Sequence, residues 1–231
     1  MRRFAWLILS IGLTAGVVGC GDSDTSGTGG SSGTATVSGI TYSAALDGES
    51  TVLPGAIVSV VGGASTTSGA DGTFSLEAPV GTTTFLTTAS NAWGALETAD
   101  VPAEGENEAE PEVIPDALVA TIGAALMETI DPGKGIVAVE FNDEVADGGE
   151  SADLGSNYGF AFVFDADGNP EIGNQLAAGA DAIVFFVNVD ITSNVMPSAS
   201  AAGGGACPLD FPSVMFPSQA EVFTFVDVTC P

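Results

Sequence analysis

The 231-residue chain carries 30 acidic residues against three lysines and arginines, has no histidine, and has a formal net charge of −27 at pH 7. This charge excludes nucleic-acid binding, which depends on basic contacts to phosphate. The lack of histidine excludes Ser-His-Asp and Cys-His nucleophile systems and imidazole metal ligands.

Residues 1–19 have the features of an export signal. The basic start Met1-Arg2-Arg3 precedes an apolar run from Phe4 to Gly16, which is shorter than the roughly 20 residues of a transmembrane helix but has the length of a signal-peptide core. The run ends in Val17-Val18-Gly19-Cys20, which resembles a bacterial lipobox. The resemblance implies cleavage before Cys20, a diacylglyceryl group on its sulfur and an acyl chain such as palmitate on its amine. The alternative is an ordinary secretory signal with a chance cysteine.

Residues 20–34 are expected to form a lipid anchor and a flexible tether. Two or more acyl chains hold a protein stably on a bilayer, so the lipid bilayer is the expected partner of Cys20. An aspartate after this cysteine usually means retention in the inner membrane of Gram-negative bacteria, so Gly21 indicates the outer membrane by resemblance. Residues 21–34 are Gly, Ser, Thr and two Asp, and such a chain stays flexible with a reach of roughly 20 Å.

Cleavage of the signal would make the chain still more acidic. Lys134 would be the one basic residue left against 30 acidic ones, a net charge of −29. Such a charge suits solubility, cations or basic partners, and it repels anionic lipid headgroups.

Residues 35–101 are predicted to form a first β-sandwich, because short runs of strand-forming residues alternate with turns. In Thr73–Glu77, Phe74 and Leu76 share one face and the polar residues share the other. Asp71-Gly72 predicts a hairpin turn before this run. The expected strands are 35–44, 57–61, 65–68, 73–77, 82–89 and 95–101.

This segment resembles the carboxypeptidase regulatory-like domain, a transthyretin-like β-sandwich. The resemblance is carried by Gly39, Leu53, Pro54, Gly55, Ala56, Val58, Val60, Thr67, Asp71, Gly72, Phe74 and Gly81. It implies a structural or interaction module without catalytic residues. Within it, Pro54-Gly55 would set a tight turn, and Phe74 would fill the space between two sheets.

Residues 102–133 are predicted to be an acidic linker followed by a helix. Pro102–Glu112 is rich in glutamate, and a like-charge block of this kind is normally solvated. Apolar residues recur every fourth position from Leu118 to Ile130, which predicts one apolar helix face. Pro115 suits the start of this helix and Pro132 its end. We expect the helix to pack on the domain that follows.

Residues 134–231 are predicted to form a second Ig-like or transthyretin-like sandwich. Expected strands are 135–141, 158–164, 182–190 and 221–230, with an acidic loop at 142–149. The almost entirely apolar run 182–190 predicts a central strand. Cys207 and Cys230 suit a disulfide in an exported compartment, worth about 3 kcal/mol; two free thiols are the alternative.

Carboxylates suggest one candidate metal site. Asp165 and Asp167 lie in a sequence similar to a calcium loop, but its glycine comes too early for an EF-hand, and a β-turn is the alternative. A Ca²⁺ site would require the fold to bring Asp143, Glu144 and Asp147 beside them.

Trp93 is the candidate ligand residue. We expect it in a loop, where its ring could stack on a sugar or instead cover the edge of the sandwich. Paired carboxylates could also make a glycosidase, but 30 acidic residues guarantee chance pairs.

The sequence thus predicts an all-β, non-enzymatic lipoprotein with two sandwiches and one connecting helix. No catalytic residue and no cofactor is expected, Ca²⁺ being the one open candidate. The expected role is structural, adhesive or ligand-displaying, with an envelope protein or a glycan as partner. The alternative is a calcium- or carbohydrate-binding module.

Overall fold

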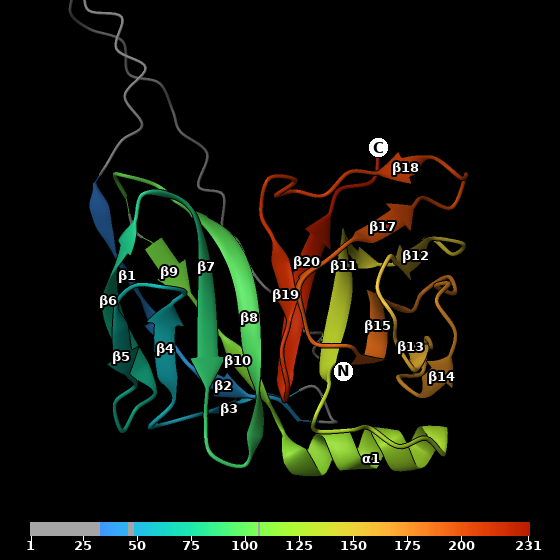
Figure 1. The fold of residues 1–231 in the computed structure, drawn as a ribbon, viewed down its shortest axis with the longest axis horizontal. Coiled ribbons are helices and arrows are strands. Elements are labelled where there is room, and N and C mark those ends of the chain that lie inside the picture. Colours follow the sequence, from blue (N-terminus) through green and yellow to red (C-terminus); the bar gives the residue numbers. More distant parts are fainter. Residues whose placement is uncertain (1–32, 46–48, 106) are drawn as a thin grey trace, which may run out of the picture.

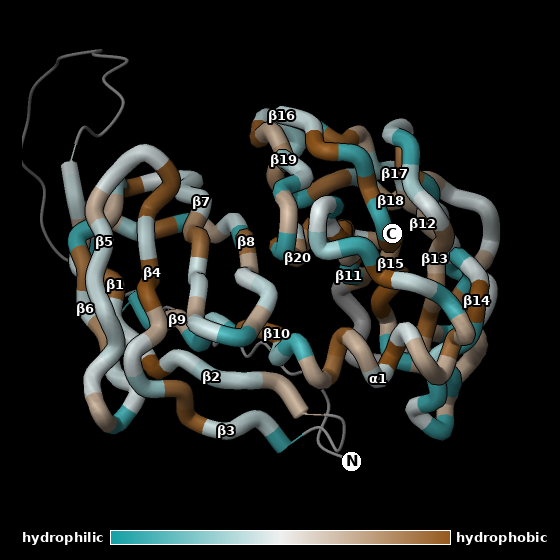
Figure 2. The backbone as a smooth tube through the Cα atoms, turned by 60° about the horizontal axis from the view of Figure 1, so that its bottom comes forward, coloured by the Kyte–Doolittle hydropathy of each residue, from teal (hydrophilic) through white to brown (hydrophobic). Residues whose placement is uncertain are grey.

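The computed structural model describes residues 33–45, 49–105 and 107–231. This part of the chain forms two β-rich lobes that lie side by side, with its single helix, α1, below the second lobe (Figure 1). Figure 2 shows β10 between the first lobe and α1, which lies at the lower side of the second lobe. The expected all-β class with one connecting helix is confirmed.

The first lobe is a sandwich of two layers. One layer is the sheet β6-β1-β9, and the other is built from β4, β5, β7 and β8. Phe74 and Phe85, from opposite layers, belong to one buried cluster. As predicted, Phe74 and Leu76 are buried while their neighbours along β6 are exposed. The strands of this lobe are β1 (Thr34–Ile40), β2 (Tyr42–Ser43), β3 (Thr51–Val52), β4 (Ile57–Val60), β5 (Ser65–Thr67), β6 (Thr73–Pro79), β7 (Gly81–Thr88), β8 (Ala92–Val101) and β9 (Asn107–Ala109).

The Asp71-Gly72 turn joins the two layers, so the predicted hairpin is wrong. β5 pairs with β4, whereas β6 pairs with β1. Gly72 has a φ of 74°, and Asp71 Oδ1 accepts hydrogen bonds from the Thr73 backbone N–H (3.2 Å) and hydroxyl (2.7 Å). The dipeptide therefore makes the tight turn it predicts, but it does not determine which strands the turn joins.

The acidic segment 102–112 contributes to the sheets, although we expected a solvated linker. Its strand β9 pairs in parallel with β1. A Cβ at Gly39 would lie 1.7 Å from the Ala109 carbonyl oxygen, so this close pairing requires glycine at position 39. β10 (Glu112–Pro115) then pairs with β8 and β2.

Helix α1 (Asp116–Leu126) follows β10 directly. It ends earlier than the apolar spacing predicts because Met127 adopts a left-handed conformation with a φ of 55°. Ile130 therefore packs on the core from beyond the helix end. The helix contacts the second lobe, as expected, through a cluster that includes Phe162. Within the described residues no helix is both long and apolar enough to span a membrane.

The second lobe is built on the strand order β14-β13-β15-β11-β20. The apolar β15 lies between β13 and β11, as its sequence predicted. Along β11, Val137 and Val139 join the cluster on one face of the sheet, while Ile136 and Ala138 join the α1 cluster on the other. The bounds are β11 (Gly135–Val145), β13 (Phe160–Phe164), β14 (Pro170–Ile172), β15 (Asp181–Val189) and β20 (Val222–Val228).

Short strands cover the face of this sheet that lies opposite α1. They form the sheets β12-β17-β18 and β16-β19, and none of them was predicted. β11 also continues to Val145, into the segment expected to be an acidic loop. The bounds of the covering strands are β12 (Ser151–Leu154), β16 (Thr192–Val195), β17 (Pro197–Ser200), β18 (Ala206–Cys207) and β19 (Phe216–Ser218).

A parallel strand pair joins the two lobes. β8 of the first lobe pairs with β20 of the second, from Gly94↔Val222 to Leu96↔Thr224. The result is one 12-stranded sheet that runs through both lobes. The regions 35–101 and 134–231 are therefore connected by backbone hydrogen bonds as well as by the chain between them.

Candidate functional site

The candidate calcium loop forms a hydrogen-bonded turn. The Asp165 carboxylate accepts hydrogen bonds from the backbone N–H groups of Asp167 (2.9 Å) and Asn169 (2.7 Å). These bonds hold the pKa of Asp165 below its usual value, because they favour the ionised form. The carboxylate thus fixes its own turn, which is the alternative that the sequence left open.

The second half of the proposed calcium site is described only in part. The Asp147 backbone N–H donates to Glu150 Oε1 (2.8 Å), whereas the side chains of Asp143 and Glu144 lie outside the described residues. No group of three or more Cys, Asp or Glu side chains that could hold a metal occurs among those that are described. The joint site of Asp143, Glu144, Asp147, Asp165 and Asp167 stays a prediction.

Trp93 lies in a strand and not in the loop that we expected, and its ring is buried. It lies in β8 with 4% of its surface exposed, and its ring meets Phe223 edge-to-face at 5.8 Å. This leaves no open ring face for a sugar. The small neighbours of Trp93 suggested a loop, but a Cβ at Gly94 would lie 2.9 Å from the Thr87 carbonyl oxygen, so glycine there lets β8 lie close to β7.

The disulfide between Cys207 and Cys230 is confirmed. The two cysteines are 23 residues apart in sequence, with their Cα atoms 4.3 Å apart. The bond ties β18 to the chain that follows β20, and it closes one end of the second lobe.

A carboxylate cluster that sequence reasoning missed lies near the junction of the lobes. Glu140 on β11 is paired in register with Asp227 on β20, and the two carboxyl groups share a hydrogen bond. Glu97 on β8 lies near enough for both to affect its titration. Their strands are adjacent in the long sheet, in the order β11-β20-β8. All three residues are half-buried.

Burial determines the titration of this cluster. It raises the pKa of Glu140 to about 8, and the charge of Asp227 adds to the shift. Burial likewise raises the pKa of Asp227 to about 6, with Asp210 adding to it. The pKa of Glu97 is raised well above its usual value by burial, and then by Glu140, Asp227 and Glu112. Like charges so close cannot all ionise at neutral pH, so the cluster holds protons there.

A sequence signal for the cluster existed. Ile136, Ala138 and Glu140 occupy alternate positions of β11, so the carboxylate continues the apolar row that faces α1. Asp227 follows Phe225 on β20 in the same way. An acidic residue on the same face of a strand as buried apolar residues is predicted to have a carboxyl group with a shifted pKa. It does not predict that two such groups face each other.

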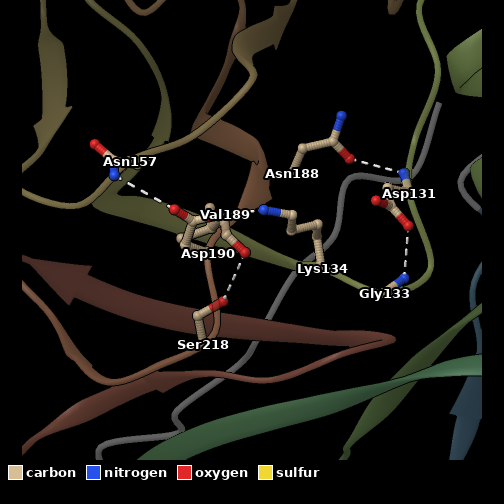
Figure 3. Close-up of polar contacts among 8 residues, drawn as sticks. All are labelled: Asp131, Gly133, Lys134, Asn157, Asn188, Val189, Asp190 and Ser218. Carbon is tan, nitrogen blue, oxygen red and sulfur yellow. Dashed lines mark hydrogen bonds and ion pairs between the residues drawn. The ribbon is translucent and has the colours of Figure 1, made fainter.

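The polar site around Lys134 lies at the turn that leads into β11. Its ammonium forms an ion pair with Asp190, and Asn157 Nδ2 donates to the same carboxylate at 3.3 Å (Figure 3). These contacts raise the pKa of Lys134 and lower that of Asp190. The side chains are 35% and 50% exposed, so the pair is screened by solvent and suits a surface contact better than a reaction centre.

Asn188 holds this turn in place from the neighbouring strand. Its Oδ1 accepts from the Asp131 backbone N–H (2.7 Å) and its Nδ2 donates to the Thr129 carbonyl (2.8 Å), as Figure 3 shows for the first contact. The pairing of β11 with β15 skips Asn188, which has a φ of 57°. Asparagine tolerates this left-handed conformation better than most residues do.

We expect Asn188→Ala to lower the free energy of unfolding by about 1–3 kcal/mol, since two hydrogen bonds are lost and alanine is strained at positive φ. Asn188→Gly is the matched control, because it loses the same bonds but adopts this φ freely. Urea denaturation of both variants should show the smaller loss for glycine. Equal losses of stability in the two variants would contradict a contribution from the left-handed backbone conformation at position 188.

Comparison with known proteins gives no functional assignment. No protein-family model and no curated protein matches the chain. The Bacillus anthracis TIE protein aligns with 84% of this chain at 10% identity and a TM-score of 0.26; this chain spans about a third of it, 34%. A mutant of the shaft pilin spaA from Lactobacillus rhamnosus GG aligns with 85% of this chain and 98% of its own, at 12% identity and a TM-score of 0.27. A DUF3823 family protein from Parabacteroides merdae has the same coverage and TM-score at 14% identity. Likenesses this distant carry no argument about function.

Proposed function

We propose that this protein is an exported, lipid-anchored lipoprotein of the cell envelope with a non-enzymatic structural or adhesive role. The observation that carries the proposal is Cys20, which directly follows the small residues Val17-Val18-Gly19 at the end of a signal-like apolar run. Acylation there would fix the chain to a bilayer without a membrane-spanning helix. Gly21 favours the outer membrane of a Gram-negative bacterium.

Two further observations support export. Residues 21–34 have the composition of a flexible tether, and β1 begins where this composition ends, at Thr34. The disulfide between Cys207 and Cys230 is of the kind that persists in oxidising compartments outside the cytoplasm. A tethered sandwich would therefore stand clear of the lipid surface.

The chemistry of the chain supports a non-enzymatic role. Histidine, the commonest general base, does not occur in the sequence. The half-buried pair Glu140 and Asp227 is joined by a direct hydrogen bond, whereas the two carboxyl groups of a glycosidase lie about 5 Å or more apart to admit substrate. The first lobe also has the layered core expected of a carboxypeptidase regulatory-like module, with Phe74 between the sheets.

Expression of the full-length chain and of Cys20→Ser in a Gram-negative host tests the proposal. For the unaltered chain we expect an intact mass that lacks residues 1–19 and carries added acyl chains, in a form that sediments with membranes. Cys20→Ser should remain unacylated and be recovered unanchored. Cys207→Ser is the matched control, since it removes a cysteine far from the processing site and should leave acylation unchanged.

An unprocessed, unacylated chain in the soluble fraction would contradict the anchor. Processing without acylation would leave an exported protein that is not a lipoprotein, which is the alternative of an ordinary secretory signal.

A further inference from the structure

The contact between the two lobes is short. Among the described residues, β8 of the first lobe pairs with β20 of the second through residues 94–96 and 222–224. The Gly94 backbone N–H also donates to the Glu221 carbonyl at 2.8 Å. By comparison, the pairing of β20 with β11 inside the second lobe extends over six residue pairs. The β8–β20 pairing is therefore the easier of the two to break.

One aromatic contact also crosses this junction. Trp93, the residue before the paired segment of β8, has its ring edge-to-face against Phe223 of β20, with 5.8 Å between the ring centroids. Trp93 is 4% exposed and Phe223 is 3% exposed. Water would reach both rings if β8 moved away from β20, so Trp93 reports on the state of the junction.

Carboxyl groups lie on both sides of the junction. Glu97 directly follows the paired residues of β8, and Glu112 lies on the adjacent β10, where it accepts a hydrogen bond from the Ser50 hydroxyl. On the side of the second lobe, Glu140 of β11 is paired in register with Asp227 of β20. All four acidic residues are half-buried. Besides burial, the other three carboxylates each raise the pKa of Glu97, so charges on the two sides interact across the junction.

No basic side chain of the described residues offsets these charges. Lys134, the one lysine or arginine that the structure describes, is paired with Asp190. β15 and α1 present apolar side chains to this face of the sheet. A further carboxyl group comes from Asp210, whose backbone N–H donates to the Asp227 carbonyl at 3.0 Å. The described charged groups that face the cluster are thus all negative.

The cluster gains negative charge as the pH rises. Burial is the main cause that raises the pKa of Asp227 to about 6 and that of Glu140 to about 8, and it also raises the pKa values of Glu97 and Glu112. The hydrogen bond between Glu140 and Asp227 needs a proton on one of the two groups, so it is lost when both ionise. Unpaired charges are costly away from water, and this cost falls if the strands part and water enters.

We propose that the junction of the two lobes is a pH-dependent hinge, closed while its carboxyl groups are protonated and opened by their mutual repulsion once they ionise. β8 separates from β20 on opening, and each lobe keeps its own core. The chain through β10 and α1 keeps the lobes connected. Opening at this place relieves the repulsion because two of the four carboxylates lie on each side. This inference does not depend on the lipid anchor.

Hydrogen exchange of single amides on the full chain tests the hinge. After correction for the intrinsic exchange rate, protection of the Gly94 amide should fall at least about tenfold between about pH 5 and pH 8. The amides of Thr41 in the first lobe and Ala152 in the second, which donate to the Gly72 and Asn174 carbonyls, should keep their protection. Unchanged protection at Gly94 would mean that the junction stays closed. A parallel fall at all three amides would mean that the cluster affects global stability alone, and would equally overturn the hinge.

Tryptophan fluorescence gives an independent measurement. Trp6→Phe leaves Trp93 as the single tryptophan of the chain. Its emission should shift to longer wavelength between about pH 6 and pH 8, the range set by Asp227 and Glu140, while the far-UV circular dichroism stays unchanged. A loss of circular dichroism over the same range would show unfolding instead of opening.

Two double variants identify the groups that drive the shift. In the Trp6→Phe background, Glu97→Gln with Glu140→Gln leaves one ionisable carboxyl group of the original four on each side and should suppress the change in emission. Glu108→Gln with Glu171→Gln removes the same number of charges from exposed positions on β9 and β14 and should leave the change as it is. A full shift in the first double variant would overturn the assignment of the hinge to this cluster.

Discussion

Replacing Glu140 by glutamine should stabilise the protein above about pH 8 and leave its stability nearly unchanged below about pH 4.5. Burial raises the pKa of this carboxyl group to about 8, so the folded state holds a proton that the unfolded state releases near pH 4.5. The group's contribution to stability is complete below that pH and is lost as the pH rises towards 8.

The expected gain at high pH is about 2–4 kcal/mol. A shift from 4.5 to about 8 sets an upper limit near 5 kcal/mol at 1.36 kcal/mol per pKa unit. Glu140 is only half-buried, so solvent screening reduces this limit. Urea denaturation from about pH 4.5 to pH 9 measures the effect.

Two comparisons make this result specific. Glu108→Gln, an exposed position on β9, should follow the wild-type curve at every pH. Asp227→Asn should show a smaller gain over a lower range, because the pKa of Asp227 is raised only to about 6. A Glu140→Gln curve parallel to that of the wild type would mean that the Glu140 carboxyl group titrates normally.

Removing the disulfide should cost about 3 kcal/mol in the free energy of unfolding. The bond between Cys207 and Cys230 closes a loop with a sequence separation of 23 residues, and loss of the bond restores conformational freedom mainly to the unfolded chain. The double variant Cys207→Ala, Cys230→Ala tests this in chemical denaturation.

Reduction provides the control. A reducing agent should lower the stability of the wild type by a similar amount and leave the double variant unaffected. If the double variant unfolds at the wild-type denaturant concentration, the bond adds nothing to stability. If it is destabilised far beyond reduced wild type, then packing of the cysteines, rather than the cross-link, is responsible.

The strands with strong local patterns could be predicted from sequence. In β6 the alternation of Phe74 and Leu76 with polar residues fixes which side faces the core. In β15 the apolar run predicts burial on both faces of the sheet, and the strand lies between two others. The disulfide was predicted from the cysteine content together with the expected export, since Cys207 and Cys230 are the two cysteines left after Cys20.

The features that depend on distant pairing could not be predicted. β9 is acidic and short, and it forms because Gly39 leaves room for the Ala109 carbonyl. The chain after Asp71-Gly72 crosses from one layer to the other because β6 pairs with β1 and not with β5. Trp93 is buried by Phe223, from the other end of the chain. In each case the deciding contact is far away in the sequence.

The candidate sites also depend on contacts between residues that local sequence patterns do not reveal. Glu150 and Asp147 are close in sequence, but only the fold buries Glu150, where the Asp147 backbone N–H donates to its carboxylate. Glu140 and Asp227 are 87 positions apart by their numbers and meet through parallel pairing of β11 with β20. Sequence composition predicted an excess of carboxylates, but it did not predict which of them the fold buries.

The position of Lys134 affects how the protein would be digested outside a cell. Proteases that cleave after lysine or arginine have this one target between residues 33 and 231. Its backbone N–H bonds to the Asp131 carbonyl (3.0 Å), and its own carbonyl accepts from the Glu221 N–H (3.1 Å). Cleavage would therefore require local opening of the turn before the bond could enter an active site. Trypsin-like enzymes would leave the folded protein intact and cut the unfolded one into two large fragments.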